Sequence, residues 1–272
     1  MITVSVANNK GGVGKTSTAI TLAYYFSEKG KKVCLVDLDP QMNSTTYFLP
    51  SFKDDYDLGG MGAAALFDES HPIDFIPLPP TVVGSREMYH DQIFIIPAFE
   101  EALTLVEQGL DSSIPLINAL NRFEEIKALD FDVIIFDVQP AICTKQLAAV
   151  LLSDHVVVPV EADNFSAAGL VKMYEICEVA KEQNGTNKPE IHYFANKVFN
   201  QASDSLGKLD YMHQQLGDYM LKNYIPSSSV FSSAIAASRP VFKMPPNGNA
   251  AVFGKKVLAV LDELAQRFGL EG

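Results

Sequence analysis

The stretch KGGVGKT, residues 10–16, decides how this chain is expected to fold. It follows a short β-branched and apolar run at residues 2–7, and it leads into residues 15–28, where apolar positions recur with helical spacing. Gly30 ends that pattern, and KVCLVDL at residues 32–38 is typical of a second buried strand. The segment therefore predicts a strand, a loop, a helix and a strand, a unit that is normally parallel and right-handed.

The same loop carries the groups that a phosphate-binding site needs. Glycines let backbone N–H groups approach phosphate oxygens, and the following helix contributes the positive end of its dipole. Lys15 is placed for the β- and γ-phosphates, and the Thr16 hydroxyl is placed for Mg²⁺. The general pattern GxxxxGK[ST] requires glycine where this chain has Asn9, so the strict motif fails by one residue. The predicted nucleotide-binding residues are Gly11, Gly12, Val13, Gly14, Lys15, Thr16 and Ser17.

Further apolar runs extend the alternation of strands and helices along the chain. Strands are expected at residues 92–98, 131–137, 155–161 and 191–197. Helices are expected around residues 99–107, 114–128 and 165–183. Apolar strands of this kind suit a parallel sheet that is covered on both faces. We therefore predict an α/β fold with a mostly parallel, twisted sheet and helices on both faces.

The organisation of the remaining chain is less regular. Residues 48–92 are rich in Pro, Gly and Asp, and we interpret them as an irregular insertion in a single domain spanning residues 1–272. A short helix at residues 61–67 and a weak strand near residues 73–76 are expected inside it. Residues 249–268 place apolar side chains on one helical stripe, which predicts packing on the sheet; a membrane-surface helix is the alternative.

Two aspartates follow apolar strands on the edge where the phosphate loop is expected. Asp39 ends the second strand, and Asp137 ends the run VIIF. Open α/β sheets bind their ligands at the carboxyl ends of the strands, so both carboxylates are candidates for Mg²⁺ or water. The alternatives are a turn residue before a proline for Asp39 and a helix cap for Asp137.

KGGVGKT, together with VDLDPQMNST at residues 36–45, resembles the deviant Walker A family of ATPases, which includes the ParA and Soj partition proteins and MinD. The similarity covers most of the chain, including FDVIIFDVQP at residues 131–140 and VVVPVEADNFSAAGL at residues 156–170. The resemblance implies a P-loop NTPase fold, hydrolysis of ATP with Mg²⁺, and a homodimer that ATP joins face to face. In that dimer Lys10 would reach the phosphates of the partner's nucleotide; taken alone, Lys10 is equally well a solvated loop lysine.

The resemblance also implies roles for particular residues. Asp39 matches the residue that orients the attacking water in relatives, and Asp137 matches the Walker B position. Asn196 matches a position that contacts adenine, and Pro226 lies in a segment that would flank the ring; Asn196 alone is more typical of a turn. The predicted catalytic residues are Lys10, Lys15 and Asp39, and the predicted metal-binding residues are Thr16, Asp39 and Asp137. Gln139 departs from the DxPP found in many relatives.

Partition ATPases of this type bind DNA without sequence preference in their ATP-dimer state, which requires basic side chains for the phosphates. Relatives often carry arginine after the Ile–Pro pair, whereas three serines follow Pro226 here. The basic residues that could replace that arginine, each of which is by itself typical of solvated surface charge, are Lys222, Arg239, Lys243, Lys255 and Lys256.

The composition narrows the classes of function. A formal net charge of -12 argues against a wholly basic surface, so DNA binding would depend on a local patch. Cys34, Cys143 and Cys177 form no CxxC pair, which disfavours an iron–sulfur or metal site built on them. No apolar run approaches the roughly 18 residues of a membrane span, and the N-terminus does not resemble a signal peptide, so we expect a cytoplasmic protein, which would be nucleoid-associated if it binds DNA.

The function that follows is a ParA-like ATPase that slowly hydrolyses ATP and positions plasmid, chromosome or other cargo by ATP-dependent, non-specific DNA binding. A ParB-like or other adaptor protein would stimulate it. A MinD-like positioning ATPase on the membrane and a metabolic P-loop enzyme remain as alternatives. The membrane alternative predicts a basic, apolar C-terminal helix, and the mixed charge of residues 249–268 disfavours it. Lys10 together with the DLDPQ segment disfavours the metabolic enzyme.

Overall fold

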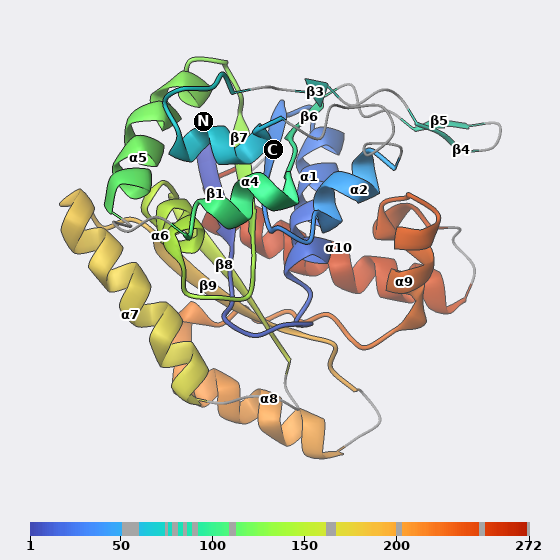
Figure 1. Cartoon of the computed structure of the whole chain (residues 1–272). Coiled ribbons are helices and arrows are strands. Elements are labelled where there is room, and N and C mark those ends of the chain that lie inside the picture. Colours follow the sequence, from blue (N-terminus) through green and yellow to red (C-terminus); the bar gives the residue numbers. More distant parts are fainter. Residues whose placement is uncertain are drawn as a thin grey trace.

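A twisted seven-stranded sheet forms the centre of the protein (Figure 1), and its strands lie in the order β3-β6-β2-β7-β1-β8-β9. The computed structural model describes residues 1–50, 60–73, 76–77, 81–83, 86–88, 92–108, 113–161, 167–199, 203–244 and 248–270. Neighbouring strands are parallel except for β3 and β6, which pair antiparallel. The strands are β1 (Ile2–Val6), β2 (Val33–Leu38), β3 (Ile76–Pro77), β6 (Ile93–Ile96), β7 (Val133–Val138), β8 (His155–Glu161) and β9 (Glu190–Asn196).

Helices cover both faces of this sheet. Figure 1 shows α5, α6 and α7 on one side and α1 and α10 on the other. The α-helices are α1 (Lys15–Glu28), α2 (Asn43–Phe48), α4 (Glu100–Leu105), α5 (Ser113–Lys127), α6 (Thr144–Leu151), α7 (Ala167–Asn184), α8 (Ser203–Leu216), α9 (Ser229–Ala236) and α10 (Asn249–Arg267). The short elements are the 3-10 helices η1 (Gly62–Phe67), η3 (Gly217–Tyr219) and η4 (Val241–Lys243) and the separate strand pair β4 (Thr81–Val83) and β5 (Arg86–Met88).

The apolar runs became the buried strands for a physical reason. In β2 and β7 every residue is buried, because helices pack on both faces and leave no position for a solvated side chain. The register between these strands pairs Asp37 with Asp137, so two carboxylates meet at the carboxyl edge of the sheet. The predicted α/β fold with a mostly parallel sheet is confirmed.

Residues 61–67, predicted as a short helix in an insertion, form the 3-10 helix η1, and all of its residues are buried. The guanidinium of Arg122, on α5, donates to the carbonyl oxygens of Ala65 and Asp68 and holds η1 against the core. The strand expected near residues 73–76 is the two-residue β3, which begins at Ile76. Much of the remaining predicted insertion at residues 48–92 lies outside the described residues, as do residues 165–166 of a predicted helix.

The tail helix packs on the molecule as predicted. Phe253, Val257 and Leu264 of α10 are buried in the core, and Tyr25 of α1 donates a hydrogen bond of 2.6 Å to Asp262. The apolar stripe is therefore covered by the rest of the fold. In the described part of the chain, no helix is both long enough and apolar enough to span a membrane.

Candidate nucleotide site

The loop between β1 and α1 adopts a backbone that requires glycine. Gly12 has φ 77° and Gly14 has φ 96°, values that side chains disfavour. A Cβ atom at Gly14 would lie 2.4 Å from Nδ2 of Asn196. That Nδ2 donates a hydrogen bond of 2.8 Å to the carbonyl oxygen of Val13. The end of β9 is thereby fastened directly to the phosphate loop.

Lys15 begins α1 and is only 7% exposed. Its ammonium donates to the carbonyl oxygen of Lys10 over 3.0 Å. Burial lowers the pKa of Lys15, whereas the charges of Asp137 and Asp39 oppose that shift. Lys10 itself lies on the exposed surface of the loop, and its backbone N–H donates to the Asn8 side chain. The two lysines of the loop therefore face different surroundings, one the interior of the site and one the solvent.

Asp137, at the carboxyl end of β7, is fully buried. Its Oδ2 accepts a hydrogen bond of 2.7 Å from the Ser44 hydroxyl, and Thr16 also donates to the carboxylate. Burial raises the pKa of Asp137 to about 6. Its other oxygen, Oδ1, is buried and has no hydrogen-bond partner in the described part of the chain. A buried carboxylate oxygen without a partner, next to a threonine hydroxyl, provides the hard oxygen ligands that Mg²⁺ prefers.

Asp37 lies beside Asp137 and supports the loop after β2. Its carboxylate accepts from the Thr45 hydroxyl at 2.7 Å, from the Thr45 N–H at 2.9 Å and from the Asp39 N–H at 3.1 Å. Burial, and then the adjacent Asp137, raise the pKa of Asp37 to about 8. Asp39 is held in turn, because its Oδ1 accepts from the N–H of Gln41 at 2.9 Å. The position of Asp39 is thus set by the turn that Asp37 organises.

Two adjoining cavities meet at the phosphate loop. The first has a volume of about 690 Å³, and Lys15, Thr16 and Asp39 all line it. The second has a volume of about 590 Å³ and is lined by Asn196 and Pro226. Both are bordered by Gly12, Gly14 and Ser17. One extended molecule could therefore place an anionic group in the first cavity and a flat ring in the second.

The segment around Pro226 is held in place by backbone hydrogen bonds to the end of β9. Ile225 donates to Ala195 over 2.9 Å, Val198 donates to Ile225 over 3.1 Å, and Ser227 donates to Val198 over 2.8 Å. These bonds give the second cavity a fixed wall. Shortly after Pro226, Ser229 begins α9, a helix that the sequence analysis did not predict.

Three further residues at the site were not predicted. The side-chain amide atoms of Asn9 are buried without a partner among the described residues. Ser44 bonds Asp137, and Lys197 donates both to Glu161 over 2.7 Å and to the carbonyl oxygen of Gly12. Asn9 had a signal in the sequence, because it departs from the standard motif. Ser44 and Lys197 had none, since their partners are distant in the chain.

The predicted basic residues have different surroundings. Lys243 pairs with Glu28 at 2.6 Å, and the ammonium of Lys256 lies 5.3 Å from the centroid of the Tyr224 ring. Lys222 and Lys255 are exposed, whereas Arg239 is half-buried.

A phosphate loop between a buried strand and a helix, backed by carboxylates at neighbouring strand ends, defines the class of P-loop nucleotide hydrolases. The family model described as AAA domain matches residues 1–191, and the chain belongs to that family. Within it, the chain is an ATPase of the ParA, Soj and MinD type, as its resemblance implied.

Individual proteins have related sequences. The chain is 29% identical over 263 residues to the uncharacterized protein MJECL24 of Methanocaldococcus jannaschii, covering 93% of this chain and 95% of that protein. It is 30% identical over 176 residues to the chromosome-partitioning ATPase Soj of Thermus thermophilus, covering 64% of this chain and 61% of Soj.

Solved structures share the fold. The ATP complex of Cyanothece McdA has a TM-score of 0.81 at 18% identity, covering 100% of this chain and 98% of that one. A cobyrinic acid a,c-diamide synthase of Mycobacterium smegmatis with bound ADP and magnesium has a TM-score of 0.64 at 21% identity, covering 89% and 92%. At these identities the likeness concerns the fold alone.

Proposed function

We propose that this ATPase binds ATP with Mg²⁺, forms an ATP-dependent sandwich homodimer, and positions plasmid, chromosome or other cargo by ATP-dependent, non-specific DNA binding. The observation that carries the proposal is that Lys15, Thr16 and Asp39 line one cavity, which adjoins a second cavity lined by Asn196 and Pro226. The triphosphate fits the first cavity and adenine the second. An adaptor protein of the ParB kind would stimulate turnover.

The phosphate loop supplies the groups that hold the triphosphate. The backbone of residues 11–17 offers N–H groups at the start of α1, and Lys15 places a positive charge among the phosphate oxygens. The Thr16 hydroxyl and the unpartnered oxygen of Asp137 are the proposed Mg²⁺ ligands. Bound there, Mg²⁺ would neutralise charge on the β- and γ-phosphates.

Asp39 is the proposed residue that orients the attacking water. It lies in the phosphate cavity, is 6% exposed, and is fixed by the Gln41 N–H. A carboxylate held in this way accepts a hydrogen bond from water and aligns it with the γ-phosphate. The same carboxylate lines the cavity together with Thr16, and holding a water of the Mg²⁺ shell is its proposed metal-site role.

Lys10 is the proposed contact between subunits. Lys10 is on the exposed surface of the loop, whereas Lys15 is buried. A second copy of the chain placed face to face would receive this ammonium at its own triphosphate. The dimer would then depend on ATP, because the nucleotide supplies the negative charge that compensates both lysines.

The packing of α10 supports DNA over a membrane as the surface on which the protein works. Its apolar residues, such as Val257 and Leu264, are buried in the core and are not available for lipid. Of its basic residues, Lys255 is exposed, and the ammonium of Lys256 lies over the ring of Tyr224. Phosphate contacts from such lysines, doubled in a dimer, would give affinity that falls steeply with salt.

A set of variants separates the two lysines of the loop. Lys10→Ala should bind ATP but fail to form the ATP-dependent dimer in light scattering. Lys15→Ala should lose nucleotide binding itself by roughly 100-fold, the order expected for losing a charge-assisted contact. Lys172→Ala, an exposed lysine of α7 outside the site, is the matched control and should behave as wild type. A Lys10→Ala protein that dimerises normally would refute the bridging role.

A second experiment discriminates among the functions. The same preparation is mixed with plain duplex DNA or with anionic lipid vesicles, with ATP and with ADP, over a range of salt concentrations. We expect retention on DNA with ATP only, weakening as salt rises. Retention on vesicles alone would favour the membrane alternative, and ATP turnover without either interaction would favour a metabolic enzyme.

A further inference from the structure

Three potential metal ligands gather at the edge of the sheet opposite to the nucleotide site. His155 is the first residue of β8, and Glu190 is the first residue of β9. The parallel register pairs His155 with Glu190, and His192 follows two residues later on the same face of β9. Because the phosphate loop leaves the carboxyl end of β1, this group at the amino ends of parallel strands is remote from it.

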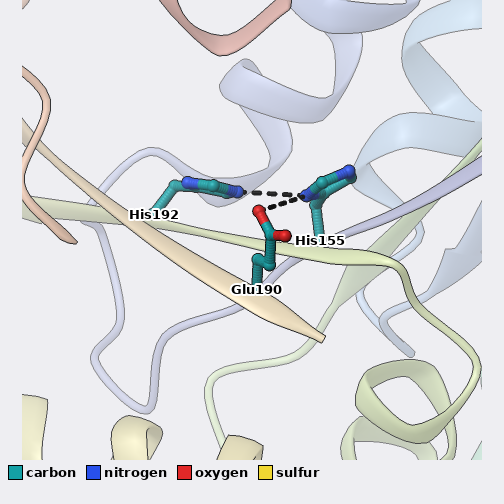
Figure 2. Close-up of side chains that lie close together, drawn as sticks. All are labelled: His155, Glu190 and His192. Carbon is teal, nitrogen blue, oxygen red and sulfur yellow. Dashed lines mark hydrogen bonds and ion pairs between the residues drawn. The ribbon is translucent and has the colours of Figure 1, made fainter. Parts of the chain in front are cut away.

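The side chains of these three residues point toward one another (Figure 2). Nδ1 of His155 lies 3.1 Å from Nε2 of His192 and 3.8 Å from Oε2 of Glu190. One ligand atom from each residue lies within 4.8 Å of the others. Two ligands on one tetrahedral Zn²⁺ are about 3.4 Å apart, from bond lengths near 2.1 Å. The two imidazole nitrogens are close to this spacing, and Glu190, whose side chain is 56% exposed, would rotate to approach them.

In the hydrogen bond that joins the two rings one facing nitrogen carries a proton, so a metal ion would bind the tautomers that leave a lone pair on both facing nitrogens. Burial lowers the pKa of His155, and burial, then His155 and Arg267, lower the pKa of His192 to about 3. Glu190 contributes the negative charge.

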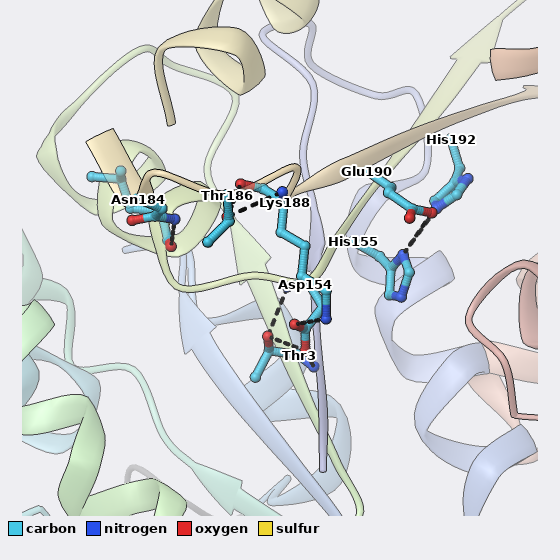
Figure 3. A network of polar contacts seen from close by, with 9 residues as sticks. Thr3, Asp154, His155, Asn184, Thr186, Lys188, Glu190 and His192 are labelled. Atoms are coloured by element: carbon cyan, nitrogen blue, oxygen red, sulfur yellow. Dashed lines mark hydrogen bonds and ion pairs between the residues drawn. The ribbon is translucent and has the colours of Figure 1, made fainter. Parts of the chain in front are cut away.

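The nearby cations are occupied by other groups. Lys188 pairs with Asp154 at 2.6 Å, which in turn accepts from Thr3, and Figure 3 shows this network beside the histidines. Arg267 donates to the carbonyl oxygens of Asp218 and Met220. The positive charges of Lys188 and Arg267 are thus partly compensated. They repel a bound cation less than two unpaired basic side chains would.

The surroundings of the group also suit a bound ion. A cavity of about 310 Å³ borders Glu190 and His192 and offers room for a water as a fourth ligand. The ring of Phe268, just after α10, stacks on His155 with ring centroids 4.5 Å apart.

We propose that His155, Glu190 and His192 form a binding site for a divalent transition-metal ion of the zinc class. The two imidazole nitrogens and the carboxylate are three protein ligands, which leaves one position for water. The ion would join the starts of β8 and β9 under the ring of Phe268, and would stabilise the sheet edge on which the end of α10 rests. Its nitrogen ligands distinguish it from the Mg²⁺ site, which has oxygen ligands only.

The test uses the full-length chain without an affinity tag and stripped with a chelator. Zn²⁺ is titrated by calorimetry and by competition with a chromogenic chelator, in excess Mg²⁺ so that the oxygen-ligand site is occupied. We expect one Zn²⁺ per chain, with a Kd in the micromolar range or tighter, and a higher Tm in its presence.

Variants identify the ligands. Glu190→Gln changes a largely exposed side chain and should fold normally while weakening Zn²⁺ binding by at least about 10-fold. His192→Gln should weaken it further, with folding checked by circular dichroism. His71→Gln, an exposed histidine that contacts Asp68, is the control and should bind as wild type. Absence of tight binding in the wild-type chain, or equal binding by Glu190→Gln and wild type, would overturn the proposal and leave a histidine–histidine hydrogen bond as the role of the pair.

Discussion

Replacing Gly14 by alanine should destabilise the protein through two separate effects. The first is conformational: φ is 96° at Gly14, and a residue with a Cβ held there costs about 1–2 kcal/mol. The second is steric: the new Cβ would lie 2.4 Å from Nδ2 of Asn196. Moving that amide away weakens its 2.8 Å hydrogen bond to Val13, worth about 1 kcal/mol. We expect a total loss of about 2–3 kcal/mol.

Two companion variants separate these effects. Gly12→Ala should show the conformational cost alone, about 1–2 kcal/mol, because φ is 77° and no heavy atom lies within 4 Å of the new Cβ. Asn196→Ala should lose about 1 kcal/mol with its hydrogen bond. In the double variant Gly14→Ala with Asn196→Ala the clash is gone, so the combined loss should be smaller than the sum by about 1 kcal/mol.

The assay is urea unfolding of the nucleotide-free chain, followed by circular dichroism and analysed as a two-state transition. The double-variant cycle reports the contact between the phosphate loop and the end of β9 directly. The reasoning fails if Gly14→Ala costs no more than Gly12→Ala, or if the Gly14 and Asn196 substitutions add to within about 0.5 kcal/mol.

Three other predictions concern charged groups. Lys197→Met should weaken ATP binding about 3- to 10-fold in a fluorescence titration, because Lys197 joins Gly12 to Glu161. The control, Lys181→Met, breaks a similar ion pair with Glu178 and should leave ATP binding unchanged. Glu107→Gln should lower the free energy of unfolding in urea by about 3 kcal/mol, because the ammonium of Lys145, which is 1% exposed, would keep a buried charge without a counter-charge. Lys145→Met should cost less, and equal losses would contradict the prediction. The nucleotide-free chain in Mg²⁺-free buffer should lose stability as pH rises toward and through about 8. The pKa of Asp37 is raised in the folded chain, which therefore holds a proton that the unfolded chain releases. Asp37→Asn should flatten this dependence, and an unchanged slope in urea unfolding between about pH 6 and 8 would refute the prediction.

The strands could be predicted because their signal is local. Runs such as residues 133–136 and 156–160 are apolar throughout, and a sheet covered on both faces accommodates such runs. The helix α2, which was not predicted, has no such local signal. Asn43–Phe48 in α2 is mostly polar, and α2 forms where the Thr45 N–H and hydroxyl bond Asp37. Its helical conformation depends on a buried carboxylate at the end of β2.

The residues of the candidate site also fall into two groups, those with a local signal in the sequence and those without one. Lys15, Thr16 and the glycines could be identified from the sequence, because phosphate binding by a loop and a helix N-terminus requires these residues at consecutive positions. The bond between Asn196 and Val13 joins residues 183 positions apart, and the bond between Ser44 and Asp137 joins residues 93 positions apart. Nothing in the local pattern around either residue indicates its partner.

The sequence by itself determined the chemistry of the phosphate loop and the apolar strands that carry it, because both depend on neighbouring residues. The tertiary structure decided which distant groups meet: the oxygen of Asp137 beside Thr16, and the pairing of β8 with β9 that brings His155 to His192. The physical reason is that strand order and register set these distances. A parallel sheet joins strands through long crossovers, so neighbours in space are remote in the chain.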